Sequence, residues 1–392
     1  MSDVQLLFLV LALLYGWECA CWVRRGSVAF TTWLGRTWRL AHPGSLFGNQ
    51  RGGFIFAAPL PPLGTILGAN QFPLSLSPDA VLAYVATTVN RDWRPPQSGR
   101  FLNFDAVRDV WVKGKKVIAQ GQVLWSAPTM SLARHVAETL KRLASLTPPQ
   151  REKAIHELIS ADLNSNQVEQ RWMAFRQHSR NVRILCNVLF LYLFVLAPFL
   201  IWNLGFKLSW LGLLLGLVAL TLTTAVLFQR AHKKLYPLAE DERFTHTLTV
   251  ALSPANAVRA CDALSRPLFE TLHPLAVAKV FMPTNRFRQF ASEVLLDIRH
   301  PALPVCPSDD AVMRATELFG RTALRQTVEQ LLKRNGIDPE ELCRPPAPTD
   351  DSCRAYCPRC GTQFTSVDAK CADCGGLKLV AFTGNAGGGT EE

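Results

Sequence analysis

Three apolar stretches constrain the fold of this chain more than any other feature of its sequence. They cover residues 4–23, 184–204 and 208–228. Each is about 20 residues long, so as an α-helix it would match the roughly 30 Å thickness of a bilayer hydrocarbon core. The composition, 19% charged against 48% hydrophobic, is typical of apolar spans combined with soluble parts. The sequence therefore predicts a multi-domain α+β membrane protein with three transmembrane helices.

The first stretch has two further interpretations. A signal peptide would need a basic n-region and a small-residue cleavage site. Residues 1–3 contain neither Lys nor Arg, and no A-x-A site precedes Cys19. We therefore expect a retained anchor with its N-terminus outside. A helix lying on the membrane surface stays open as the alternative, because Gln5 and Glu18 make this segment less apolar than the other two.

The dense groups of basic residues next to the three stretches all fall on one side of the membrane, which the positive-inside rule assigns to the cytoplasm. The expected topology places residues 24–183 and 229–392 in the cytoplasm, with the second and third stretches as a hairpin through the inner or plasma membrane. This placement explains much of the formal net charge of +11 and disfavours a nucleic-acid partner. The flanking residues are Arg24, Arg25, Arg36, Arg39, Arg171, Arg176, Arg180, Arg183, Arg230, Lys233 and Lys234, with only Lys207 between the second and third stretches.

The first cytoplasmic region is expected to be rich in strands. Residues 24–71 contain many Gly and Pro, which bar a further membrane helix and leave a short strand at 54–58. Strand-forming runs then accumulate from residue 72, and residues 110–119 read as a hairpin that turns at a glycine. An amphipathic helix over 131–146 closes this unit.

The segment 102–110, which reads LNFDAVRDV among antiparallel strands closed by one helix, resembles bacterial membrane-linked pleckstrin-homology-like domains. The resemblance covers residues 72–146 and implies a small barrel that recognises lipid or protein and does not catalyse a reaction. An ordinary α+β domain without a ligand is the alternative. Lys113, Lys115 and Lys116 lie on the hairpin turn, where contact with anionic headgroups would contribute about 1 kcal/mol per charge. A solvated turn is the alternative there.

The rest of the chain reads as helices followed by a small metal module. Proline and glycine punctuation predicts juxtamembrane helices over 149–183 and a helical bundle over 240–342. A Pro-rich linker covers 343–352, a zinc ribbon 353–383 and a flexible tail 384–392.

The ribbon prediction rests on four cysteines, Cys357, Cys360, Cys371 and Cys374, in the pattern C-x₂-C, ten residues, C-x₂-C. Each pair can form a tight knuckle, because a glycine follows its second cysteine. Four thiolates at about 2.3 Å fill a tetrahedral Zn²⁺ shell, and the metal would supply the folding energy of so small a unit. The motif resembles the short zinc ribbons found at the ends of many bacterial proteins.

Alternatives to structural zinc differ in what they require. A rubredoxin-like iron site uses the same four ligands, so iron stays an alternative metal. A redox C-x-x-C normally lies near a βαβ pattern, which is absent here. A catalytic zinc needs an open position, and four cysteines leave none. Cys353 lies four residues before Cys357 and could compete for the metal, but the paired spacing favours the other four.

No motif in the sequence indicates a particular enzymatic reaction. G-x-x-x-x-G-K-[ST], H-E-x-x-H and G-x-S-x-G are all absent, and no catalytic residue is assigned. The expected function is a membrane-anchored non-enzymatic adaptor, or an accessory subunit of a membrane protein complex, that contacts lipids and protein partners. One alternative is a membrane-bound enzyme with a site built from dispersed residues and an unspecified substrate. Another is a zinc-dependent regulator whose ribbon reports metal supply.

Overall fold

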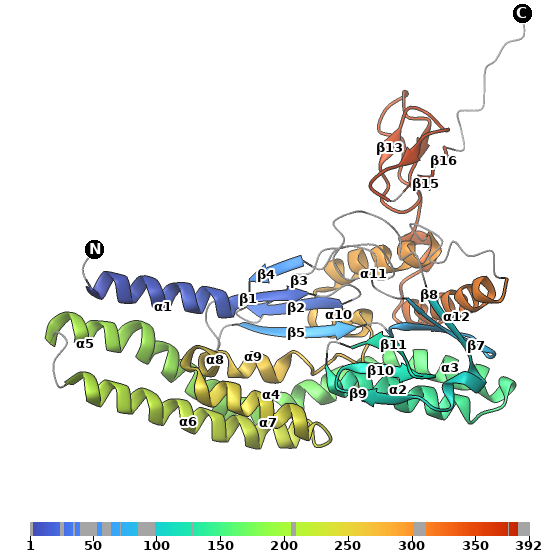
Figure 1. Ribbon diagram of the computed structural model, residues 1–392. Helices are drawn as coiled ribbons and strands as arrows, with labels where there is room; N and C mark the ends of the chain where they lie inside the picture. Colours follow the sequence, from blue (N-terminus) through green and yellow to red (C-terminus); the bar gives the residue numbers. More distant parts are fainter. Residues whose placement is uncertain are drawn as a thin grey trace, which may run out of the picture.

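The computed structural model shows its apolar helices side by side at one end of the molecule, with the strands and remaining helices toward the other (Figure 1). The tail predicted at 384–392 and the basic positions 24, 25 and 207 lie outside the described residues. The described segments are residues 3–23, 27–33, 36–39, 53–56, 64–70, 72–84, 99–127, 129–204, 209–300, 311–374 and 376–382.

The second apolar stretch is part of one long helix. α4 (Ser165–Leu191) continues through a π-helical turn, η2 (Tyr192–Leu196), into α5 (Ala197–Leu204). The π turn precedes Pro198, which has no N–H to donate and whose ring would clash with the carbonyl four residues earlier, so the helix widens there. α6 (Ser209–Leu235) then runs back beside α4 and α5 (Figure 1).

Two helices, and not the three predicted, have the length and apolarity to cross a membrane within the described residues. They are Ser165–Asn203 and Trp210–Leu235. The prediction of a third span over 4–23 is wrong, because α1 (Asp3–Cys19) ends early. After α1 the chain continues as β1 (Ala20–Val23), which pairs with another strand. The 17 residues of α1 therefore extend only about 25 Å. α1 nevertheless lies beside α5, with its N-terminal end at the α5–α6 end of the molecule (Figure 1).

The segment predicted as Gly- and Pro-rich holds more strands than expected. β4 (Gly53–Phe56), the partner of β1, matches the strand predicted at 54–58. β2 (Ser27–Trp33) is the centre of a separate antiparallel sheet between β3 (Arg36–Arg39) and β5 (Gly64–Asn70). The aromatic and β-branched residues of 27–33 carry the signal that would have revealed this sheet.

The β-rich unit consists of two three-stranded antiparallel sheets followed by helix α2 (Met130–Ala144). The order of strands, glycine-turned hairpin and closing helix is the one expected from the sequence, whereas the likeness to pleckstrin-homology-like domains stays a prediction. The first sheet contains β6 (Leu74–Leu76), β7 (Ala80–Tyr84) and β8 (Gly99–Asn103). A 3₁₀ turn, η1 (Phe104–Val107), leads to the second sheet of β9 (Trp111–Lys113), β10 (Lys116–Ala119) and β11 (Gln122–Ser126).

Helix α2 closes this unit for reasons visible in its sequence. The Thr129 hydroxyl accepts a hydrogen bond from the Leu132 N–H at 3.1 Å, which caps the first turn. Leu132, Val136 and Leu140 recur on one face and are buried in one hydrophobic cluster with residues of both sheets. The next helix, α3 (Pro148–Asp162), packs on α2 and contributes Arg151, whose guanidinium lies 4.0 Å from the Phe104 ring centre.

The helices after α6 share one hydrophobic core with α4 and α6, so the bundle predicted at 240–342 is joined directly to the apolar helices. The Cys186 thiol of α4 donates a hydrogen bond to the Ala257 carbonyl at 3.3 Å, which marks this contact. The helices are α7 (Glu240–Leu252), α8 (Pro254–Val258), α9 (Ala260–Ser265), α10 (Pro274–Phe281), α11 (Thr284–Arg299), α12 (Ala311–Arg334) and α13 (Pro339–Leu342).

Candidate metal centre

The first cysteine pair lies in a tight turn between two short strands of the C-terminal unit, β12 (Ala355–Tyr356) and β13 (Gln363–Phe364). The Cys357 N–H donates to the Thr362 carbonyl at 2.8 Å, and the Gly361 N–H donates to the Cys357 carbonyl at 2.9 Å. Gly361 has a φ of 75°, in the left-handed region that favours glycine. The glycine predicted to permit this knuckle therefore does so.

The second pair is built in the same way. β14 (Lys370–Cys371) ends at its first cysteine and pairs with β15 (Leu377–Lys378). The Gly376 N–H donates to the Cys371 carbonyl at 2.8 Å, and Gly376 has a φ of 84°. The sequence pointed to Gly375, which lies outside the described residues. A last strand, β16 (Val380–Ala381), joins β12 and completes the unit.

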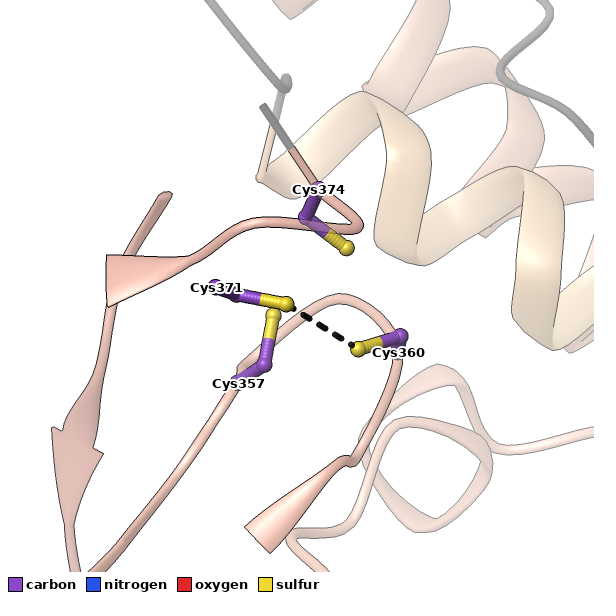
Figure 2. A group of neighbouring side chains, drawn as sticks. All are labelled: Cys357, Cys360, Cys371 and Cys374. Atoms are coloured by element: carbon purple, nitrogen blue, oxygen red, sulfur yellow. Dashed lines mark hydrogen bonds between the residues drawn. The ribbon is translucent and has the colours of Figure 1, made fainter. Parts of the chain in front are cut away.

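The two knuckles bring the four predicted cysteines together, with their sulfur atoms pointing toward one another (Figure 2). All four Sγ atoms lie within 4.8 Å of one another, and Cys360 Sγ lies 3.6 Å from Cys371 Sγ. Four sulfurs around a tetrahedral ion at about 2.3 Å would be separated by roughly 3.8 Å. A disulfide would instead need about 2.05 Å. The donor set and spacing therefore fit Zn²⁺, with iron as the alternative that shares this geometry.

The surroundings of the cysteines shift the pKa values of their thiols in different directions. Burial alone would raise the pKa of Cys360, but hydrogen bonds with Thr362 and with neighbouring cysteines lower it to about 7. Burial, together with the hydrogen bond to Cys360, raises the pKa of Cys371 to about 11. Burial likewise raises the pKa of Cys374. Four adjacent thiolates need a cation among them, so metal binding would displace the protons that these thiols hold.

Cys353 does not belong to this cluster. It is buried, and its Sγ lies 3.5 Å from the Asp350 carboxylate, which is bound in turn by Ser352. The sequence left Cys353 open as a competing ligand. Among the described residues, the cluster contains only the two C-x₂-C pairs, so the paired spacing identified it correctly.

The first knuckle also contacts the helical part of the protein. Arg359 lies between the two cysteines of that knuckle, and its Nε donates to Asp297 Oδ1 of α11 at 2.5 Å. Both side chains are only 11% exposed. No sequence signal pairs these residues, because they are 62 positions apart.

The three lysines proposed to contact lipid lie where the sequence predicted, on the β9–β10 turn. Lys113, Lys115 and Lys116 are exposed, and Gly114 between them has a φ of 59°. Within the described part of the chain no ion pair involves them. This exposure is compatible with either a solvated turn or a headgroup contact, so the lipid contact stays a prediction.

A second group of titratable residues was not found from the sequence. The Thr129 hydroxyl donates to Glu270 Oε2 at 2.7 Å where α2 meets the segment between α9 and α10. Burial raises the pKa of Glu270 and of nearby Asp162 to about 7 each. Such carboxylates are what the enzyme alternative would require. An open cavity of about 580 Å³, however, lies elsewhere, along α4.

No protein-family model, curated protein or solved structure matches this chain. The candidate site therefore rests on its own geometry and chemistry.

Proposed function

We propose that the protein is a non-enzymatic adaptor, or an accessory subunit of a membrane protein complex, anchored by α4–α5 and α6 and carrying a structural Zn²⁺ ribbon. The observation that carries this proposal is the convergence of four cysteine sulfurs without an open coordination position. A closed shell stabilises a fold and does not activate a substrate. The ribbon is then a binding module presented by the membrane-anchored body.

Membrane anchoring is supported by how little of the two long helices is buried. In the most apolar 18-residue stretch of each helix, only 28% and 22% is buried inside the protein, whereas the core helix of a soluble protein is mostly buried. Their outward side chains include Phe199 at 64% and Leu215 at 61% exposed. Exposed apolar surface on this scale needs lipid or another protein to cover it.

The expected sidedness has support in the same arrangement. Arginines precede the apolar part of α4 and basic residues follow that of α6, so the positive-inside rule assigns the ends of both helices away from the hairpin to the cytoplasm. The β-rich unit, the later helices and the ribbon would then lie in the cytoplasm, where a reducing environment keeps the four thiols available for metal. The β-rich unit would serve as the pleckstrin-homology-like recognition module, for lipid or for protein.

Metal content and partner recovery test this proposal on the full chain purified in mild detergent. We expect one zinc per chain by elemental analysis. Cys357→Ser and Cys371→Ser should each lose most of it, while Cys353→Ser should keep it. An adaptor should also be recovered with a stoichiometric partner that a chain truncated after residue 342 no longer binds. A chain that is always recovered alone, or that holds no metal, would contradict the proposal.

A zinc-dependent regulator is the second candidate, and the Arg359–Asp297 contact favours it. Metal loss would unfold the knuckle that positions Arg359, so ribbon docking would depend on zinc. Partner binding that disappears with a chelator and returns with zinc would support regulation. Partner binding that survives chelation would leave the ribbon as a purely structural module.

A further inference from the structure

An open cavity of about 580 Å³ lies along one side of α4, and its described lining is dominated by arginines. Arg176, Arg180 and Arg183 are separated by four and three residues, so they lie on successive turns of one helix face. The row extends about 10 Å along the helix axis. Gln177 and Asn187 add amide groups to the same lining. We name this feature the arginine groove.

The charges of the arginine groove are not neutralised by the described part of the protein. No described residue forms an ion pair with any of the three arginines, and none of the described lining residues is acidic. Like charges on successive helical turns repel one another. An anion with several acceptor oxygens would relieve this repulsion, because each guanidinium can donate two parallel hydrogen bonds to a phosphate.

With α4–α5 and α6 spanning a bilayer, the groove would lie at the depth of the lipid phosphates. The apolar part of α4 begins at Ile184, immediately after the last of the three arginines. On α6, which runs back beside α4, the apolar part ends just before Arg230, Lys233 and Lys234. In both helices the apolar part ends next to basic residues, as expected at a membrane–water boundary.

An apolar stripe continues from the groove along the same helix. Ile184, Val188 and Leu191 are 51%, 40% and 56% exposed and recur at spacings of four and three residues. Val195 follows four residues later at 56% exposed. A molecule with phosphate at one end and hydrocarbon at the other would match the arginine row and this stripe together.

We propose that the arginine groove binds the phosphate of an anionic phospholipid headgroup, with an acyl chain lying along the stripe from Ile184 to Val195. Three guanidiniums over about 10 Å favour a headgroup with more than one negative charge. The inference rests on the proposed function in one respect, which is that α4–α5 and α6 span a membrane. It is separate from the lysine turn of the β9–β10 hairpin, which lies on another element.

The test compares two triple variants of the full chain in phosphatidylcholine nanodiscs, with and without a small fraction of diphosphatidylglycerol. Arg176→Gln/Arg180→Gln/Arg183→Gln removes the groove charges. Arg230→Gln/Lys233→Gln/Lys234→Gln removes three charges from the same boundary on α6 and serves as the matched control. Native mass spectrometry counts the anionic lipid that each protein retains, and zinc content with thermal unfolding shows that both variants fold.

We expect the affinity of the groove variant for anionic lipid to fall on the order of a hundredfold, since each of the three charges contributes about fivefold. The control should lose far less. Equal losses in both variants would overturn the inference in favour of a general basic belt. Displacement of the lipid by soluble glycerol phosphate would overturn the lipid assignment, because it would show that the acyl stripe does not contribute.

The same experiment separates this inference from the proposed function. Wild-type protein that alkaline carbonate extracts from membranes would contradict the membrane anchoring itself. Wild-type protein that resists extraction, but whose lipid retention is unchanged by the groove variant, would overturn the arginine groove alone. The variant Arg176→Lys/Arg180→Lys/Arg183→Lys keeps the charge but loses bidentate geometry, so it should retain an intermediate amount of lipid.

Discussion

Arg359 of the first metal knuckle donates to Asp297 of α11 at 2.5 Å, and both side chains are almost fully covered. This ion pair links the ribbon to the helical part of the protein, although a Pro-rich linker separates the two in sequence. Because Arg359 lies between Cys357 and Cys360, the turn that aims two sulfurs at the metal also aims the guanidinium at α11. We therefore expect metal binding and ribbon docking to be coupled through this one short turn.

Removal of the carboxylate from this pair should release the ribbon. In Asp297→Asn the covered guanidinium loses its charged partner, which we expect to cost about 1.5–3 kcal/mol of docking free energy. Limited proteolysis should then cleave the linker at 343–352 faster than in the wild type. Arg354→Gln, which removes an exposed ribbon charge outside the pair, is the control. Equal cleavage of wild type and Asp297→Asn would show that other contacts hold the ribbon.

A second prediction follows from the left-handed backbone conformation of Gly361. A Cβ at this position would meet nothing within 4 Å, so only backbone strain opposes substitution. Gly361→Ala should weaken the first knuckle by about 1–2 kcal/mol, whereas Gly361→Asn should cost less because asparagine tolerates this region. Zinc affinity measured by competition with a chelator checks both variants. If alanine and asparagine weaken zinc binding equally, backbone strain is not the cause.

Packing between the two long helices depends on a glycine of α6. The Tyr192 hydroxyl donates to the Leu213 carbonyl at 2.7 Å, and a Cβ on Gly216 would lie 2.8 Å from that hydroxyl oxygen. Gly216→Ala should therefore break the hydrogen bond and cost about 1 kcal/mol. Gly212→Ala is the control, since its Cβ would meet nothing within 4 Å.

A double-mutant cycle isolates the effect of that hydroxyl. In a Tyr192→Phe background the steric conflict is removed, so Gly216→Ala should no longer lower thermal stability in detergent. A Gly216→Ala loss that persists in this background would mean that the clash involves something other than the tyrosine hydroxyl.

The buried carboxylates predict a pH dependence of stability. Burial raises the pKa of Asp162 from 3.8 to about 7 and that of Glu270 from 4.5 to about 7. The folded protein therefore binds more protons than the unfolded chain between these values, and stability falls as pH rises from about 4 through 7. Asp162→Asn and Glu270→Gln should remove part of this fall, so their melting temperatures should drop less than the wild type's between pH 5 and pH 8.

Two controls separate the effect of these carboxylates from other contributions to the pH dependence. Burial lowers the pKa of His273 to about 3, which makes stability fall as pH drops below about 6.5 and so opposes the carboxylates. The difference between variant and wild type removes that common contribution. Glu138→Gln, which removes an exposed carboxylate of α2, is the matched control for the loss of a carboxylate. A carboxylate variant with the wild-type profile would show that these groups ionise normally in the folded protein.

Local sequence patterns identified much of the architecture. The predicted helix at 131–146 corresponds to α2, and the hairpin at 110–119 to β9 and β10, because hydrophobic period and glycine turns act over a few residues. The third transmembrane span failed for a non-local reason. Apolar composition continues to residue 23, but pairing of β1 with β4 ends the helix at Cys19. Composition does not record which distant strand will compete for a segment.

The sequence by itself determined the four-cysteine cluster and the two long apolar helices, since cysteine spacing and apolar length are both properties of short stretches of sequence. The tertiary structure alone decided which helices share a core with them and that Arg359 meets Asp297. It also decided that the arginines of α4 have no ion-pair partner among the described residues. Such relationships join positions that are far apart in the chain. They depend on how whole elements pack, which no local pattern of charge or hydrophobicity specifies.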